Sequence, residues 1–372
     1  MKILFLANIP SPYRVLFFNE LGKYCDLTVV YELNNAINRN EKWKGKKAIN
    51  YKEVFLNSKR INLDSGISFS ILKFLKDKSF DLIIVGGYST PTGMLAIKYL
   101  NLKKRDFILN CDGGMIKNDK KLKFLIKKYF ISSAKYWLSS GGVSDKYLLH
   151  YGANKEGILR YHFTSLSNNN ILKELPSRYE KIDIRKKLDI KEEKVILSVG
   201  RLIHGKGFDV LIKATKDIDD NIGIYIVGGK PTEEYIELIE KLNIKNIKFI
   251  DFKTEKELEK YYLASDLFIL PTRGDVWGLV INEAMAKGIP FITTDKCVAG
   301  LEFVSKGNCG KIIKVDDVNS LSNSINEIIN DDMLLNEMSK EALNTIKDYS
   351  IEKMAIKHIE EFKKILLQER VY

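Results

Sequence analysis

Short apolar runs alternate with amphipathic stretches along most of the chain. The apolar runs have the length and composition of buried strands, and the stretches between them have the spacing of helices. Strand–helix alternation of this kind predicts parallel sheets that are covered by helices on both faces. The predicted strands are residues 3–6, 27–31, 82–85, 107–109, 195–199, 224–227, 247–250, 267–270 and 291–293.

The predicted strands fall into two sets. Between them, residues 164–177 are polar and turn-prone and include Pro176, which is typical of a linker. A chain of 372 residues is long for one hydrophobic core and sufficient for two. We therefore expect an N-terminal domain at 1–168 and a C-terminal domain at 169–349, both Rossmann-like and doubly wound, followed by helical residues 350–372.

The cysteines and the apolar runs indicate the cellular compartment of the protein. The four cysteines have no paired spacing: Cys25, Cys111, Cys297 and Cys309. They are typical of free or buried thiols in a reducing compartment, so we expect a cytoplasmic protein. The longest uncharged run, residues 82–97, is broken by glycines and a proline and is not expected to span a membrane. The N-terminal run, which ends at Pro10, is interpreted as a strand and not a signal peptide.

The net charge of +12 is concentrated in the first half of the chain. Residues 1–170 contain 28 Lys and Arg against 13 Asp and Glu, whereas the remainder contains 32 against 35. Such a directional field indicates an anionic partner surface. Nucleic acid is not expected, because no recognition helix or aromatic strand platform is apparent. An anionic membrane is the other candidate.

The most basic segment, residues 117–137, has helical spacing. On a helical wheel one arc holds Lys120, Lys121, Lys123, Lys127 and Lys128, and the opposite arc holds Leu122, Leu125, Ile126, Tyr129 and Phe130. Phe124 and Ile131 fall inside the lysine arc. The arc is either a solvated face or a helix lying on anionic lipid with Phe124 inserted. We predict the second, with membrane contacts by Lys120, Lys123, Phe124, Lys127 and Lys128, and a peripheral position on the inner face of the membrane.

Residues 265–295 carry the strongest chemical signal. A strand leads into a loop with Asp275, and Gly278 then opens a helix whose acid, Glu283, lies eight positions after Asp275. A glycine at a helix start lets an anion approach bare N–H donors and the positive end of the helix dipole. Acids on either side of that anion can hold hydroxyl groups. This arrangement suits a nucleotide-sugar, in which a diphosphate lies between ribose and hexose.

The same segment resembles the acid–x7–acid signature of retaining glycosyltransferases of family 4 (glycosyl transferases group 1), which have the GT-B fold. The first acid is usually Glu in that family, and here it is Asp275. A second segment, residues 198–214, resembles the family's G-R-L-x-x-x-K-G motif, with Arg201 and Lys206 in the cationic positions. The resemblance implies two Rossmann-like domains facing a cleft, with the C-terminal helix crossing back to the first domain.

The resemblance also implies roles for these residues. Arg201 and Lys206 would hold the donor diphosphate and stabilise the charge that develops on it. Asp275 would anchor the transferred sugar and Glu283 the ribose. The donor-binding set is Arg201, Lys206, Asp275, Trp277, Gly278, Leu279, Val280 and Glu283. Transfer with retention and without a metal or other cofactor is implied. The one D-x-D, residues 217–219, ends a helix pattern and is not a strand-end metal loop.

The first domain is expected to carry the acceptor site. Asp112 follows a strand and precedes Gly113, where many family 4 enzymes have His. It is counted with Arg201, Lys206 and Asp275 as a candidate catalytic residue, and three roles stay open: acceptor base, sugar-hydroxyl ligand, or turn residue capping the next helix. The acceptor-side candidates are Asn8, Tyr13, Arg14, Gly87 and Gly113.

These observations together predict a glycosyltransferase of bacterial surface-polysaccharide synthesis. It would move a hexose or N-acetylhexosamine from a nucleotide-diphosphate sugar to a lipid-linked glycan. Another GT-B nucleotide-sugar enzyme, such as an epimerase, would share the fold and hydrate the donor instead. A basic membrane- or nucleic-acid-binding protein without catalysis is the alternative from a different class.

Overall fold

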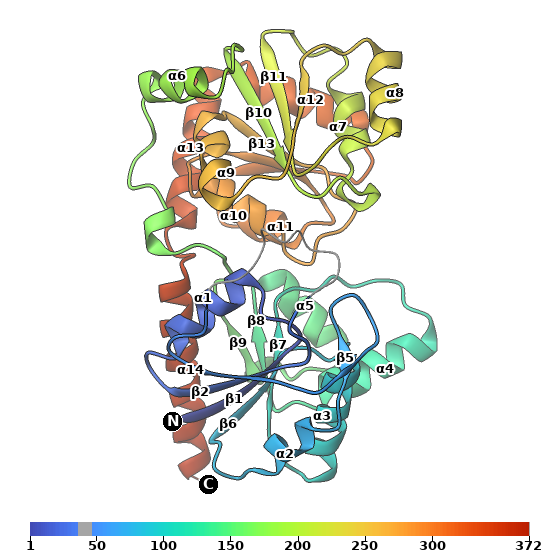
Figure 1. The fold of residues 1–372 in the computed structure, drawn as a ribbon, viewed down its shortest axis with the longest axis vertical. Coiled ribbons are helices and arrows are strands. Elements are labelled where there is room, and N and C mark those ends of the chain that lie inside the picture. Colours follow the sequence, from blue (N-terminus) through green and yellow to red (C-terminus); the bar gives the residue numbers. More distant parts are fainter. Residues whose placement is uncertain (36–46, 372) are drawn as a thin grey trace. The chain divides into compact units, whose positions relative to one another are not determined.

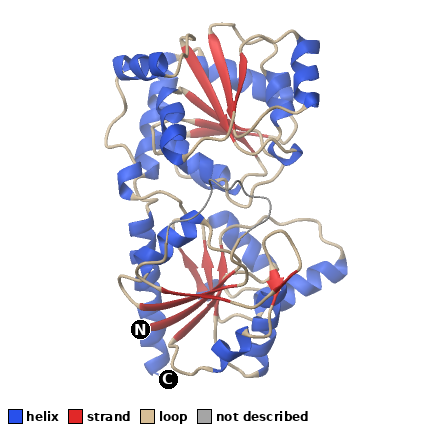
Figure 2. Cartoon of the chain, viewed as in Figure 1, coloured by secondary structure: helices blue, strands red, loops and turns tan. Residues whose placement is uncertain are grey.

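The computed structural model of the protein describes residues 1–35 and 47–371 (Figure 1). The chain forms two compact units, one of Met1–Asn168 with Tyr349–Tyr372 and the other of Asn169–Asp348. In each unit a parallel sheet is covered by helices (Figure 2). The predicted fold class, two Rossmann-like α/β domains, is confirmed.

The first unit contains a seven-stranded parallel sheet with the order β3-β2-β1-β6-β7-β8-β9. Its strands are β1 (Lys2–Ala7), β2 (Asp26–Tyr31), β3 (Lys52–Phe55), β6 (Leu82–Val85), β7 (Ile108–Cys111), β8 (Tyr136–Ser139) and β9 (Ile158–Arg160). Two short strands, β4 (Lys59–Arg60) and β5 (Gly66–Ile67), form a separate antiparallel pair. The helices are α1 (Pro12–Leu21), α2 (Ile71–Lys76), α3 (Pro91–Leu102), α4 (Lys121–Ser132), α5 (Gly142–His150) and α14 (Ile351–Val371), with a 3-10 turn at Lys155–Gly157.

The second unit contains a six-stranded parallel sheet with the order β12-β11-β10-β13-β14-β15. Its strands are β10 (Lys194–Val199), β11 (Ile222–Val227), β12 (Ile247–Ile250), β13 (Leu267–Leu270), β14 (Phe291–Thr294) and β15 (Gly310–Ile313). The helices are α6 (Arg178–Lys187), α7 (Phe208–Ala214), α8 (Glu233–Leu242), α9 (Glu255–Ala264), α10 (Leu279–Met285), α11 (Val298–Val304), α12 (Val318–Ile329) and α13 (Asp332–Ile346). Two 3-10 turns lie at Asn168–Asn170 and His204–Lys206.

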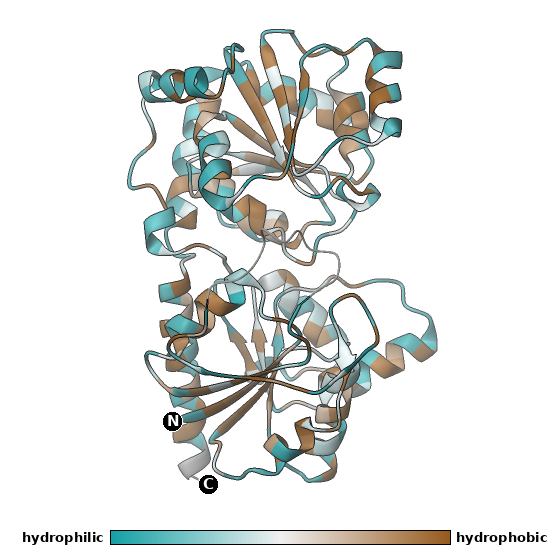
Figure 3. Cartoon of the chain, viewed as in Figure 1, coloured by the Kyte–Doolittle hydropathy of each residue, from teal (hydrophilic) through white to brown (hydrophobic). Residues whose placement is uncertain are grey.

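The central strands of both sheets are hydrophobic along their length (Figure 3). Residues on opposite faces of β1, such as Leu4 and Phe5, are both fully buried. Helices on both sides of a parallel sheet explain this continuous apolar character. Strands β3, β8, β9 and β15 were not predicted. Strand β8 lies at the end of the segment that was interpreted as one helix over residues 117–137.

The C-terminal helix α14 packs against α1 in the first unit (Figure 1). Its buried His358 lies between the rings of Phe17 and Tyr161, with ring centroids 4.8 and 4.6 Å away. The imidazole Nδ1–H donates to the carbonyl of Met354 over 2.8 Å. This contact makes the end of the chain part of the first unit's core.

We expect His358 to make stability depend on pH. Burial lowers its pKa to about 4 from the ordinary value of 6.5. Between these values the unfolded chain binds more protons than the folded one, so the free energy of unfolding falls as the pH is lowered through this window. The loss is at most about 3 kcal/mol, at about 1.4 kcal/mol for each unit of pKa difference.

The measurement is urea unfolding of the wild type and of His358→Phe at about pH 7 and about pH 5. The phenylalanine keeps an aromatic ring between its neighbours and removes the titrating group, so the variant should lose less stability on acidification. Glu32, whose pKa burial raises to about 7, affects both proteins equally. Equal losses in the two proteins would contradict the assignment.

Candidate functional site

Two loops of the second unit lie at the same edge of its sheet. Strand β10 leads into the loop with Arg201 and Lys206, and β13 leads into the loop with Arg273 and Asp275. The two strands are parallel neighbours, so their carboxyl ends point to the same edge. Ligands of open α/β sheets bind at this edge.

Lys206 and Asp275 form an ion pair across the two loops. Lys206 Nζ lies 2.5 Å from Asp275 Oδ2, and each side chain is 21% exposed. The backbone N–H of Asp275 donates to the carbonyl of Lys296 over 2.9 Å, which fixes the loop. Arg201 is exposed, and its guanidinium makes no hydrogen bond or ion pair with the described residues. Of the two predicted cations, Lys206 is therefore ion-paired, whereas Arg201 is exposed and has no side-chain partner among the described residues.

Arg273 joins the same two loops. Its guanidinium donates to both carboxylate oxygens of Asp209 over 2.8 Å, to Asp316 Oδ1 over 2.7 Å, and to the His204 carbonyl over 2.7 Å. Its backbone N–H donates to the carbonyl of Gly205 over 2.9 Å. The hydrogen bonds with Asp209 raise the pKa of Arg273. This role is not evident from the sequence, because nothing in the local pattern pairs Arg273 with an acid 64 residues away.

Two glycines at the site are required by backbone geometry. Gly207 has φ +70°, and a Cβ there would lie 2.0 Å from the carbonyl oxygen of Pro271. Gly278 has φ +108°, and a Cβ there would lie 2.7 Å from Cys297 Sγ. Both positions thus combine a left-handed backbone with close packing. Helix α10 after Gly278 has seven residues. A phosphate at this site would therefore be held by the cations and not by a helix dipole.

The remaining donor candidates occupy different environments. Glu283 on α10 is partly buried and accepts a hydrogen bond from the hydroxyl of Tyr262 over 2.9 Å. Leu279 and Val280 are partly exposed. Trp277 is only 3% exposed, and its indole N–H donates to Asn282 Oδ1 over 2.8 Å. The indole therefore belongs to the core of the unit, and the prediction that it contacts a donor does not fit this position.

In the first unit, Asp112 and Arg14 form an ion pair. Arg14 is buried, and Asp112 Oδ1 also accepts hydrogen bonds from Asn110 Nδ2 over 2.9 Å and from the hydroxyl of Tyr161 over 2.7 Å. The carboxylate thus serves as the partner of a buried cation. Helix α4 has Lys120 and not Asp112 at its N-cap, so the proposed capping role is wrong.

The other acceptor-side candidates lie at strand ends of the same sheet. Asn8 follows β1 and donates to Asp64 Oδ2 over 3.3 Å. Gly87 follows β6, and a Cβ there would meet nothing within 4 Å. Gly113 follows β7, and its carbonyl accepts from Cys111 Sγ. Tyr13, at the start of α1, packs edge-on against Phe163 with centroids 5.7 Å apart. Because β1, β6 and β7 are adjacent, the structure brings these loops to one sheet edge.

Helix α4 packs the middle of the predicted lysine arc against the protein, whereas Lys120, Lys121, Lys123 and Lys128 of that arc stay exposed. Phe124 packs against the rings of His150 and Tyr151, with centroids 5.3 and 5.4 Å away, and Ile131 is fully buried. Lys127 Nζ lies 2.6 Å from Asp119 Oδ2. The predicted insertion of Phe124 into a membrane is therefore wrong. The exposed apolar side chains are Leu122 (71%), Leu125 (50%), Ile126 (42%) and Tyr129 (49%).

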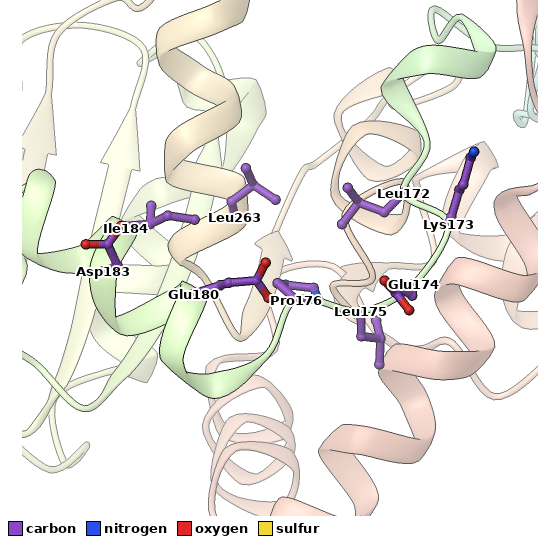
Figure 4. A pocket seen from close by; sticks show the side chains of 9 residues that line it. All are labelled: Leu172, Lys173, Glu174, Leu175, Pro176, Glu180, Asp183, Ile184 and Leu263. Atoms are coloured by element: carbon purple, nitrogen blue, oxygen red, sulfur yellow. The ribbon is translucent and has the colours of Figure 1, made fainter.

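The other features of the described residues lie away from this site. A cavity of about 520 Å³ lies between residues 172–176, α6 and Leu263 (Figure 4), and none of the donor candidates lines it. The four cysteines are free. In the part of the chain that the structure describes, no helix is long and apolar enough to cross a membrane.

Sequence comparison identifies the region that contains this site. Residues 180–345 match the family model Glycosyl transferases group 1. An uncharacterized 41.2 kDa protein in the cps region of Klebsiella pneumoniae is 27% identical over 270 residues, which cover 69% of this chain and 72% of that protein. An uncharacterized glycosyltransferase of Haemophilus influenzae is 32% identical over 189 residues. That match spans 49% of this chain and about half (51%) of the relative.

Solved structures extend the likeness to the whole chain. Anabaena HepE in complex with UDP has a TM-score of 0.77 at 17% identity, with 98% of this chain and 100% of that chain covered. WaaG, a glycosyltransferase involved in lipopolysaccharide biosynthesis, has a TM-score of 0.69 at 15% identity, with 97% and 99% covered. At such identities the likeness establishes the fold. The chain therefore has the GT-B fold, and its residues 180–345 match the family model Glycosyl transferases group 1.

Proposed function

We propose that the protein is a retaining glycosyltransferase that moves a hexose or N-acetylhexosamine from a nucleotide-diphosphate sugar to a lipid-linked glycan. The observation that carries the proposal is the meeting of Lys206 and Asp275 at one sheet edge, within the region that matches the glycosyltransferase family. A cation can hold the diphosphate of a donor, and an acid in contact with that cation can hold the adjoining sugar. The complex of HepE with UDP supports a nucleoside diphosphate as the carrier.

Each residue has a chemical task in this proposal. When the sugar departs, negative charge grows on the nucleotide diphosphate, and Arg201 and Lys206 stabilise it. Arg201 supplies a planar fork and Lys206 a point charge. Asp275 accepts hydrogen bonds from hydroxyls of the transferred sugar, and Glu283 from those of the ribose. The leaving diphosphate takes the proton of the acceptor hydroxyl on the same face, which gives retention.

Asp112 acts in this proposal through Arg14. A carboxylate that already accepts from Arg14, Asn110 and Tyr161 has most of its acceptor positions occupied. Such a group holds the acceptor-side loops in place and is poorly suited to take a proton from a hydroxyl. The proton therefore goes to the donor phosphate, as above.

The acceptor is proposed to lie at an anionic membrane on its cytoplasmic side, with α4 as the contact. Leu122, Leu125, Ile126 and Tyr129 form the apolar exposed face, and exposed Lys121 and Lys128 flank it. The one acid within residues 113–144 is Asp119, whose side chain is buried and paired with Lys127. A face of this kind suits the headgroup region of an anionic leaflet, with lysines at the phosphates and apolar side chains below them.

The first prediction concerns the donor. A melting-temperature screen with UDP-, GDP-, ADP- and dTDP-sugars should show a rise for at least one, because a ligand of the folded state stabilises it by mass action. With that donor, Arg201→Ala and Lys206→Ala should each lower turnover by roughly 30- to 1000-fold, the scale of one lost preorganised donor, or about 2–4 kcal/mol.

Lys213→Ala on α7 is the matched control. Lys213 is an exposed cation of the same unit that lies 3.9 Å from Asp209, and its loss should leave turnover near the wild-type value. Full activity of Lys206→Ala with the selected donor would show that the diphosphate is held elsewhere.

A second expectation concerns metal. Arg201 and Lys206 supply the positive charge that a divalent cation provides in other transferases, so turnover should persist in excess chelator. The measurement is the initial rate with and without EDTA at constant ionic strength. Loss of activity that Mn²⁺ or Mg²⁺ restores would contradict this assignment.

The membrane contact is tested by vesicle co-sedimentation over a salt series. Lys121→Glu with Lys128→Glu should weaken binding to anionic vesicles by roughly fivefold for each lysine, and salt should mask the effect. Leu122→Ser with Ile126→Ser should weaken it at every salt concentration, because buried apolar area is lost. Leu102→Ser, which changes a leucine of α3 that is 78% exposed, is the control. Unchanged sedimentation of both double variants would rule α4 out as the contact.

A further inference from the structure

We infer that the Lys206–Asp275 ion pair is a latch that favours the intact sugar donor over the bare nucleoside diphosphate. The inference rests on the proposed function, and it concerns how the same site tells donor from spent product. Its basis is that the two groups assigned to different parts of the donor are bonded to each other in the structure.

The pair is accessible to a ligand, while the loops that carry it are held in place. About a fifth of each side chain is exposed. Arg273 ties the two backbones together through Asp209 and the carbonyls of His204 and Gly205. Opening the pair therefore requires movement of side chains and not of loops. Lysine has a long flexible stem, so the ammonium group can turn while the backbone stays in place.

The two ligands differ in the contacts that they offer to Lys206 and Asp275 once the ion pair is broken. A nucleotide-sugar brings a diphosphate for Lys206 and sugar hydroxyls for Asp275, so both members of the pair regain a partner. A bare nucleoside diphosphate brings only the diphosphate for Lys206. It leaves the Asp275 carboxylate without its cation and close to an additional phosphate charge. The carboxylate and the phosphate repel each other, and a partly buried carboxylate that has lost its cation is destabilised.

The consequence is a lower affinity for the product than for the substrate. Both ligands meet the same cations, so the difference arises at Asp275. A site of this kind releases the spent nucleotide after transfer and limits its competition with fresh donor. The acid therefore sets the preference between donor and product in addition to holding the sugar.

Removing the charge of Asp275 should weaken this preference. We expect Asp275→Asn to bind bare UDP about fivefold more tightly than the wild type, the scale of one partly exposed ion pair, and to bind UDP-glucose less tightly. The measurement is isothermal titration with both ligands, or with the matching GDP, ADP or dTDP pair if the melting screen selects it. Glu237→Gln, which removes an exposed carboxylate of α8 in the same unit, should leave the ratio of the two affinities unchanged.

A second comparison protects the test against a variant that is merely misfolded. Lys206→Ala is introduced into the wild type and into Asp275→Asn, and the loss of UDP affinity is compared. With a latch, Lys206→Ala loses more UDP affinity in the Asp275→Asn background, because Lys206 there does not have to break an ion pair to bind UDP. Equal losses, or UDP binding by Asp275→Asn that is no tighter than wild type, overturn the latch and leave the proposed function standing. Failure of the wild type to bind any of the four nucleotides overturns both.

Discussion

The parallel pairing of β10 with β13 is the constraint on which the candidate donor site depends. It places the carboxyl ends of two strands, 71 residues apart at Val199 and Leu270, at one edge of the sheet. Arg273 then converts that proximity into a defined geometry by bonding to Asp209 and to the loop at His204. Without these bonds and the one from the Thr272 hydroxyl to the Gly205 carbonyl, Lys206 and Asp275 would be carried by two independent loops. The contact between them would then cost more conformational entropy than one ion pair returns.

The first unit shows a related solution for a buried charge. Arg14 is buried, and an unpaired guanidinium there would be very unfavourable. Asp112 neutralises it from the end of β7, and the hydroxyl of Tyr161 and the amide of Asn110 complete the carboxylate's hydrogen bonds. One cluster thus links α1, β7 and the segment after β9. This accounts for an acid at a position where many members of the resembled family have a histidine.

Helix α4 illustrates how an amphipathic pattern can be misread. A helical wheel shows that Phe124 and Lys127 share one arc and Leu122 and Ile126 another. It does not show which arc packs against the protein. Only the middle of the lysine arc packs against the protein: Phe124 contacts Tyr151, Ile131 is buried and Lys127 is neutralised by Asp119, while Lys121 and Lys128 stay exposed. The apolar arc is left in solvent, and that exposure is the basis of the proposed membrane contact.

The sequence by itself determined the local features of this protein. The spacing of apolar residues identified most strands and the division into two units, and the positions of Gly278, Asp275 and Lys206 identified the loops of the candidate donor site. Only the tertiary structure decided which side chains meet. The pairs Lys206–Asp275, Arg273–Asp209 and Arg14–Asp112 join residues 69, 64 and 98 positions apart, and the inward placement of Trp277 depends on Asn282 and the surrounding core. The physical reason is that periodicity and turn chemistry act over a few residues. Strand order and the packed face of each helix are set instead by burial and charge neutralisation over the whole unit.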